Sequence, residues 1–329
     1  MSIFKAFNRL KVLIIGDLIL DRYIIGRVDR ISPEAPVPVV LVQREELRLG
    51  GAANVALNVQ ALGATPYLLS TVGDDQEGQA FVELIKKKNI SLEGIFREKN
   101  KQTTVKVRIL AENHQLLRYD KEQISDTASD IEDQLSQKIE AIIIAHNIDV
   151  VIFQDYNKGL VTPRLIQEGL TLTKKYKIPS CIDPKKNNFL SFRGSTLFKP
   201  NLREINESLG TRIAPHEPSV PQLIEAAKKI HNCLQNEYTL ITLGAKGLFI
   251  HSAEGGYSYI NSQKRQIADV CGAGDTVISV ASLALSLGLP PEAIATMANI
   301  AGGQVCEQFG VVPVNKEHLE AAYHKLKTR

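Results

Sequence analysis

The chain of 329 residues has four cysteines, no tryptophan, no long apolar segment and almost no net charge. Cys181, Cys233, Cys271 and Cys306 lie far apart and form no CxxC pair or Cys/His metal spacing, which argues against structural zinc and favours a reducing, cytoplasmic location. The longest nearly uncharged apolar run, residues 277–289, is shorter than the ~20 residues of a membrane span. The 39 Lys and Arg against 36 Asp and Glu give a net charge of +3, which provides no electrostatic basis for binding nucleic acid or a membrane surface. We therefore expect a soluble cytoplasmic protein whose ligands are small molecules.

Short apolar runs alternate with helix-length segments along most of the chain. The run at 11–16 (KVLIIG) ends at Gly-Asp and is typical of a strand buried on both faces. Similar runs and helix-length segments follow it in alternation. The further runs are 66–72, 150–154, 180–182, 196–198 and 238–242, and the helical segments are 50–62, 127–146, 162–174, 219–234 and 274–287. This pattern predicts an α/β fold with a mostly parallel central sheet and helices on both faces.

Two β-rich insertions interrupt that alternation. Residues 22–45 contain strand-like pieces around a proline-rich link, and prolines suit edge strands and turns. Residues 102–120 have the pattern of a β-hairpin with a polar turn at 112–114. Because no Gly- or Ser-rich linker is present, we expect one domain over 1–329, with a small β-sheet lid formed by about residues 18–48 and 97–120.

The strongest local motif is DVCGAGDT at 269–276, which leads directly into an apolar helix. Gly272, Ala273 and Gly274 would present backbone N–H groups at the helix N-terminus, an arrangement that binds anions. Asp275 in the first turn would be placed to accept a proton beside a phosphate. The alternative is an ordinary glycine turn in which the helix dipole favours the Asp275 carboxylate. The residues alone leave both interpretations open.

A second glycine pair, Gly50 and Gly51, opens another helix. Small residues allow a ligand to approach closely, and Asn54 offers a donor and an acceptor to a hydroxyl-rich ligand. Tight packing of a helix on a sheet produces the same pattern. The pair does not match the GxGxxG dinucleotide fingerprint, which argues against a nicotinamide enzyme.

Charged residues of the second insertion alternate along its strands. Lys106 and Arg108 share one strand face, and Arg118 joins it if the hairpin register matches. Three cations on one side of a lid would hold a substrate phosphate. The alternative is a solvated strand face.

Polar residues also follow several strand-like runs, where open parallel sheets bind ligands. Asp155, Lys158 and Lys185 occupy such positions, although lysines in loops are often plain surface charge. The segment Gly244–Gly247 is either a tight turn or a loop that faces a nucleotide.

Asn201 and Glu204 also follow such a run, and their spacing is that of a capping box. The functional alternative is that both residues hold phosphate through a hydrated Mg²⁺.

Taken in order, these motifs resemble the ribokinase-like sugar kinases, the phosphofructokinase-B family, from residue 11 to about 314. Within it, the segments 16–23 (GDLILDRY), 30–38 (RISPEAPVP) and 50–56 (GGAANVA) are similar to the D-glycero-β-D-manno-heptose-7-phosphate kinases. Those kinases are often the N-terminal half of a bifunctional kinase/adenylyltransferase. Two departures concern the nucleotide side: Cys271 stands where threonine is usual, and FGVV at 309–312 replaces a Gly-Thr sequence.

The resemblance implies an ATP-dependent carbohydrate kinase. It would phosphorylate the anomeric (C1) hydroxyl of D-glycero-D-manno-heptose 7-phosphate to the 1,7-bisphosphate, in ADP-heptose biosynthesis for the lipopolysaccharide core. The implied cofactors are ATP and Mg²⁺, with a monovalent cation as a further candidate. The implied partners are a second copy, joined through the β lid, and a separate adenylyltransferase that acts later. The alternatives are a ribokinase- or fructokinase-like enzyme for another sugar and a catalytically silent regulator that binds a sugar or nucleotide.

The resemblance also assigns roles to individual residues. The catalytic group is Asp275 with Gly272, Ala273 and Gly274. The sugar-binding group is Asp17, Asp21, Gly50, Gly51, Asn54, Lys106, Arg108, Arg118 and Asp155. The nucleotide-binding group is Lys158, Lys185, Asn201, Glu204, Thr242, Gly244, Lys246, Gly247 and Asn299, with Glu204 holding Mg²⁺ through water.

Overall fold

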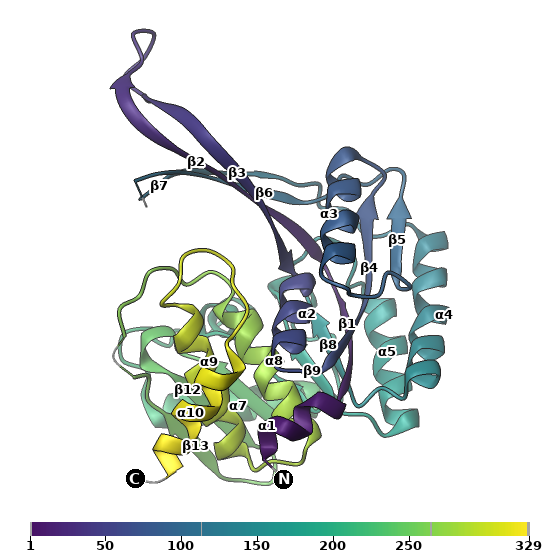
Figure 1. Cartoon of the computed structure of the whole chain (residues 1–329). Coiled ribbons are helices and arrows are strands. Elements are labelled where there is room, and N and C mark those ends of the chain that lie inside the picture. The colour runs from purple at the N-terminus through teal and green to yellow at the C-terminus, as the bar shows by residue number, and fades with distance from the viewer. Residues whose placement is uncertain (1, 113, 264, 328–329) are drawn as a thin grey trace.

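The computed structural model describes residues 2–112, 114–263 and 265–327, which form an α/β body and a smaller sheet that projects from it (Figure 1). The body contains a sheet of nine strands, parallel except for the last two hairpin strands at one edge. In spatial order the strands are β13 (Tyr257–Ile260), β12 (Leu248–Ser252), β11 (Tyr238–Thr242), β10 (Leu197–Phe198), β9 (Ser180–Asp183), β8 (Val150–Gln154), β1 (Lys11–Gly16), β4 (Thr65–Gly73) and β5 (Ile95–Glu98). The predicted mostly parallel sheet is confirmed.

Helices cover both faces of this sheet, as the alternating side chains of β1 require. Val12 and Ile14 face one core and Leu13 and Ile15 the other, and all four are fully buried. The first core receives α1 (Ile3–Ala6), α2 (Ala52–Ala61), α3 (Gln76–Lys87), α8 (Ala273–Ser286), α9 (Pro291–Val305) and α10 (Lys316–Lys327). The second receives α4 (Ser129–His146), α5 (Pro163–Tyr176), α6 (Leu202–Leu209) and α7 (Val220–Leu234). Three short 3₁₀ turns complete the body: η1 (Phe7–Arg9), η2 (Lys186–Asn188) and η3 (Gly244–Lys246).

The second sheet has four strands in the order β3-β2-β6-β7. These are β2 (Leu18–Ile31), β3 (Pro38–Gly51), β6 (Val105–Ala111) and β7 (His114–Lys121). The proline-rich link joins β2 to the edge strand β3, and this long hairpin extends well past the body (Figure 1). Residues 97 and 98, which we had placed with the lid, belong instead to β5 of the large sheet. Of the expected hairpin turn, Asn113 lies outside the described residues.

The small sheet lies over the end of the body where the strands β1 and β8 finish and the helices α2 and α8 begin (Figure 1). Both chain termini lie at the opposite end of the body. None of the helices in the described ranges has the length and apolarity needed to cross a membrane. Because the small sheet lies over these strand ends and helix starts, the predicted site residues of the body and of the small sheet can meet between them.

Candidate active site

Asp275 stands in the first turn of α8 and is buried, with 4% of its surface exposed. Its carboxylate accepts three hydrogen bonds: from Asn54 Nδ2 to Oδ2 at 2.7 Å, and from the Tyr156 hydroxyl at 2.6 Å and Gln154 Nε2 at 3.1 Å to Oδ1. Burial raises the pKa of Asp275 to about 6, although the bonds from Tyr156 and Asn54 act in the opposite direction. A carboxylate with this pKa is ionised at neutral pH and basic enough to accept a proton.

The glycine loop before α8 has the geometry of an anion site. Gly272 is the N-cap and has a φ of 79°, in the left-handed region that favours glycine. A Cβ at this position would lie 2.8 Å from Nδ2 of Asn54, so a side chain here would disturb the partner of Asp275. Ala273 and Gly274 line a cavity. The Ala273 N–H, which we expect to bind an anion, instead donates to the backbone oxygen of Val270 at 3.3 Å. The N–H of Gly274 lacks an intrahelical partner by its position in the first turn.

That cavity has a volume of about 440 Å³ and is lined by residues of α8, α9 and the segments around β11 and β12. Four of the residues predicted to bind nucleotide line it: Thr242, Gly244, Gly247 and Asn299. Val277 and Ile300 add an apolar wall. Lys246 is exposed and lies in η3 between two lining residues, but it is not itself a lining residue. Two residues of the glycine loop, Ala273 and Gly274, thus line the cavity and immediately precede Asp275 in the chain.

The cations of the small sheet share one face, as expected, but they differ in their partners. Arg108 lies opposite Arg118 in the β6–β7 register. Arg108 is buried in an ion pair with Asp21, whereas Arg118 is exposed and pairs with Asp120 at 2.9 Å. Although burial alone would lower the pKa of Arg108, the Asp21 carboxylate raises it, so the guanidinium stays charged. Arg108 therefore fixes the sheet through Asp21.

Lys106 is connected to Asp275 through Tyr156. Its ammonium lies 5.4 Å from the ring centre of Tyr156, whose hydroxyl holds Asp275. Burial lowers the pKa of Lys106, and Asp21 opposes that effect.

The two positions before α2 require glycine, because neighbouring atoms leave no room for a side chain. A Cβ on Gly50 would overlap Oδ2 of Asp21, and a Cβ on Gly51 would overlap the backbone oxygen of Asp17. Gly51 also has a φ of 62°. Without side chains at these positions, the end of β3 can pair closely with the start of β2, just before the helix α2 that carries Asn54.

Asp17 organises the loop after β8. Its carboxylate accepts hydrogen bonds from the backbone N–H groups of Tyr156, Lys158 and Leu160, at 2.8, 3.2 and 3.1 Å. Asp155 follows β8 and is also buried; burial, followed by the charge of Asp17, raises its pKa to about 6. These two predicted sugar-binding residues therefore hold the loop that carries Tyr156.

Lys158 is not brought together with the other residues that we expected to bind nucleotide. Its ammonium pairs with Glu122 at 2.6 Å, and its side chain lies beside Asp17 and Lys101, away from the cavity at Gly244 and Gly247.

Four residues of alternating charge form a chain of ion pairs close to Gly274. Asp183 pairs with Lys199 at 3.0 Å and with Lys185 at 3.8 Å, and Lys185 pairs with Glu204 at 2.5 Å. Burial alone would raise the pKa of Asp183, but Lys199 and Lys185 outweigh it and hold the pKa below its ordinary value. A Cβ on Gly274 would lie 3.7 Å from the Lys199 ammonium, so this buried cation lies close to the anion site.

Asn201 and Glu204 form the capping box that their spacing predicts. Asn201 Oδ1 accepts from the Glu204 N–H, and Glu204 Oε2 accepts from the Asn201 N–H, at 2.9 and 2.8 Å. The buried Glu204 carboxylate also holds Lys185. Across the described ranges, no group of three or more His, Cys, Asp or Glu side chains is arranged to hold a metal ion. Both oxygens of Glu204 are thus engaged, so this carboxylate and Asp183 would hold a hydrated Mg²⁺ through its water molecules.

Several residues of this site are not among those that the sequence predicts. Gln154 and Tyr156 bond to Asp275, Lys199 pairs with Asp183, and Asn58 bonds to both Asn54 and Thr276. The available signal was position: Gln154, Tyr156, Asp183 and Lys199 all end or follow parallel strands, where ligands bind.

Comparisons with known proteins agree with the fold. Among solved structures, phosphofructokinase-2 from Escherichia coli in complex with potassium superposes with a TM-score of 0.78 at 17% identity, covering 97% of this chain and 99% of that one. A putative ribokinase from Agrobacterium tumefaciens gives 0.74 at 18% identity over the same shares. The fold is therefore ribokinase-like, as the resemblance predicted.

The family model described as pfkB family carbohydrate kinase matches residues 9–317. The chain belongs to this family and is an ATP-dependent carbohydrate kinase. The bifunctional protein HldE of Citrifermentans bemidjiense is 38% identical over 320 residues, and that of Syntrophotalea carbinolica 37%. Each match covers 97% of this chain, and the chain spans 64% of the length of these two relatives.

Proposed function

We propose that the chain transfers the γ-phosphoryl group of ATP to the anomeric hydroxyl of D-glycero-D-manno-heptose 7-phosphate, giving the 1,7-bisphosphate. The observation that carries the proposal is the position of Asp275. Its buried carboxylate follows Gly274, which lines the 440 Å³ cavity, and accepts a hydrogen bond from Tyr156, whose ring centre lies 5.4 Å from the Lys106 ammonium of the small sheet. The heptose-kinase motifs and the HldE relatives support this acceptor over other sugars.

In the proposed reaction Asp275 accepts the proton of the C1 hydroxyl as its oxygen bonds to the γ-phosphorus. The bond from that phosphorus to the bridging oxygen breaks, and ADP leaves. The N–H groups of Gly274 and its neighbours and the Lys199 ammonium neutralise the charge on the phosphoryl oxygens. Mg²⁺ bound to the nucleotide would add charge neutralisation, with Glu204 and Asp183 as its carboxylates.

The small sheet would hold the distal phosphate and exclude water. Lys106 would meet the ligand's phosphate by charge, and Arg118 would do so on the exposed side of its pair with Asp120, since Arg108 is buried in its pair with Asp21. The sheet also contacts the body beyond the sugar site. Arg48 Nη1 donates to the backbone oxygen of Phe309 at 3.1 Å, and the Val311 N–H donates to the Tyr23 hydroxyl at 3.2 Å. A closed sheet would prevent water from replacing the sugar as acceptor.

The decisive experiment is an ADP-release assay of the purified protein with a panel of acceptors. Heptose 7-phosphate should give the highest kcat/KM, ahead of ribose, fructose and fructose 6-phosphate. Asp275→Asn should reduce kcat by ~10² or more while ATP binding is retained. A higher kcat/KM for ribose or fructose would make the chain a kinase for another sugar. Sugar or ATP binding without ADP release from any acceptor would favour the silent regulator.

We also propose that two copies pair through the small sheet. Its strands carry exposed apolar side chains, including Val42 at 56% and Leu117 at 55% exposure, on or beside the edge strands β3 and β7. Exposed edges and apolar faces favour pairing with another chain. Leu117→Glu should convert a dimer to a monomer in light-scattering measurements; a wild-type monomer would exclude this pairing.

A further inference from the structure

Tyr156 connects the base to both sides of the site. Its hydroxyl donates to Oδ1 of Asp275 at 2.6 Å, and its backbone N–H donates to Asp17 at 2.8 Å. The ring centre lies 5.4 Å from the Lys106 ammonium on the small sheet and 5.5 Å from the Lys185 ammonium on the body. The phenol is therefore held at both ends, and its orientation depends on parts of the chain that are far apart in sequence.

The hydrogen bonds to Asp275 are unevenly divided between its two oxygens. Among the described residues, Oδ1 accepts hydrogen bonds from Tyr156 and Gln154, and Oδ2 accepts one, from Asn54. Each carboxylate oxygen can accept two hydrogen bonds. Oδ1 is therefore fully used, and Oδ2 retains capacity for one more donor.

We propose that Tyr156 is a positioning residue that directs the acceptor hydroxyl to Oδ2 of Asp275. This inference rests on the proposed function, in which Asp275 accepts the proton of that hydroxyl. By occupying Oδ1 together with Gln154, the phenol fixes the rotation of the carboxylate. The sugar hydroxyl and Asn54 then share the other oxygen, on the N-terminal side of α2.

The charges around Asp275 are consistent with this role. Asp183, Lys199 and Lys185 face it from the ends of the neighbouring strands, while Lys106 and Asp21 of the small sheet act on Tyr156. Burial, followed by the charge of Asp275, raises the pKa of Tyr156 well above its ordinary value, so the phenol keeps its proton and remains a donor. The Tyr156 bond lowers the pKa of Asp275 and thereby helps to keep the base ionised at neutral pH.

The test is Tyr156→Phe in the full chain, with the acceptor that the panel identifies. The ring and its neighbouring ammonium groups remain, and only the hydroxyl is lost. We expect kcat to fall by about tenfold and the acid limb of the kcat–pH profile to move up by about one unit, with the sugar KM changed less than about twofold. Tyr176→Phe is the matched control, because that hydroxyl donates to Glu140 at the same 2.6 Å on the surface of α4 and α5. It should leave the profile unchanged.

A double-mutant cycle with Asp275→Asn separates positioning from a general structural effect. If Tyr156 acts through the carboxylate, adding Tyr156→Phe to Asp275→Asn should change the residual kcat by less than about twofold. An unchanged pH profile in Tyr156→Phe, or fully multiplicative losses in the double variant, would overturn the inference. Near-normal turnover of Asp275→Asn alone would instead contradict the proposed function.

Tyr156→3-fluorotyrosine provides a second measurement that does not depend on the stability of the phenylalanine variant. Fluorine makes the phenol a stronger donor, so the acid limb should move down. No movement, or movement up, would contradict the role of the hydrogen bond. Thermal unfolding of each variant establishes that the folded enzyme is being compared.

Discussion

Asn54 Nδ2 donates a hydrogen bond of 2.7 Å to Oδ2 of Asp275, which joins the first turns of α2 and α8. Both helices begin at a glycine with a positive φ, Gly51 and Gly272. The bond is buried, and Asn58 supports Asn54 from one turn below through the Asn54 Oδ1 and backbone oxygens. The position of the Asp275 carboxylate therefore depends on a contact between the two glycine-led helices.

Asn54→Asp should inactivate the enzyme with almost no change in shape. It would place a second carboxylate against Asp275, and two such groups at this distance do not both ionise. We expect kcat at pH 7 to fall by about 10²-fold, with a recovery at higher pH as the shared proton is lost. The measurement is a kcat–pH profile, with thermal unfolding to verify the fold. A profile like that of the wild type would show that Asn54 does not control the base.

The wild-type enzyme should lose activity in acid through Asp275. Burial raises the pKa of this carboxyl to about 6, and only the ionised form accepts a proton. The kcat should therefore be constant near neutral pH and fall tenfold for each pH unit well below 6. Rates measured across pH 5–8 at saturating sugar and ATP test this expectation. An acid limb near pH 4, the value for an ordinary carboxyl, would show that the working base is not buried as Asp275 is.

The cations of the small sheet should divide into a ligand-binding group and a structural one. Lys106→Ala should raise the sugar KM by about tenfold and leave the ATP KM within about twofold, because its ammonium faces the site beside Tyr156. Arg108→Ala should instead destabilise the fold by about 3–5 kcal/mol, because it leaves Asp21 buried without its partner. Steady-state kinetics and denaturant unfolding separate the two effects.

Arg27→Ala is the control for both variants, since Arg27 pairs with Asp29 on the outer part of the same sheet, where its side chain is 58% exposed. Equal sugar KM values for Lys106→Ala and the wild type would show that the Lys106 face of the small sheet is a solvated strand face and does not bind the sugar.

The sequence was most informative where backbone geometry is dictated locally. Continuous apolar runs such as 11–16 predict buried parallel strands, and the glycine pairs predict the two helix starts that form the site. The partners of Asp275 were harder to infer because Gln154 and Tyr156 reach it only when β8 and α8 are brought together by the fold. Contacts made only in the folded chain also determine the role of Asp17. Its position at the end of β1 suggests a ligand, but its carboxylate already accepts hydrogen bonds from three backbone N–H groups of the loop after β8.

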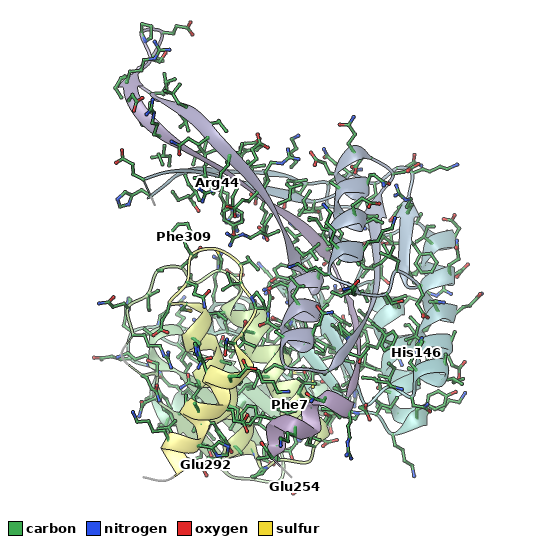
Figure 2. The ribbon with its side chains drawn as sticks, in the orientation of Figure 1. Phe7, Arg44, His146, Glu254, Glu292 and Phe309 are labelled. Carbon is green, nitrogen blue, oxygen red and sulfur yellow. The ribbon has the colours of Figure 1, made fainter. Side chains whose placement is uncertain are left out.

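Arg48 should hold the small sheet against the loop of the body at residues 309–311. Its guanidinium donates to the backbone oxygens of Phe309 and Val311, at 3.1 and 3.4 Å, and lies 4.7 Å from the ring centre of Tyr23. Figure 2 shows Phe309 on the loop that faces the small sheet, and Arg44 on the sheet itself. The same loop follows Cys306, which lines the 440 Å³ cavity.

Loss of these bonds in Arg48→Ala should favour an open sheet. We expect the sugar KM to rise by about tenfold, and hydrolysis of ATP without sugar to increase because water can enter. Arg44→Ala is the matched control, since Arg44 lies on the same strand, pairs with Glu46 at 3.0 Å and has 63% of its side chain exposed. The sugar KM and the rate of ATP hydrolysis without sugar should both stay at wild-type values in that variant. If Arg48→Ala behaves like Arg44→Ala, the contacts with Phe309 and Val311 do not hold the sheet closed during turnover.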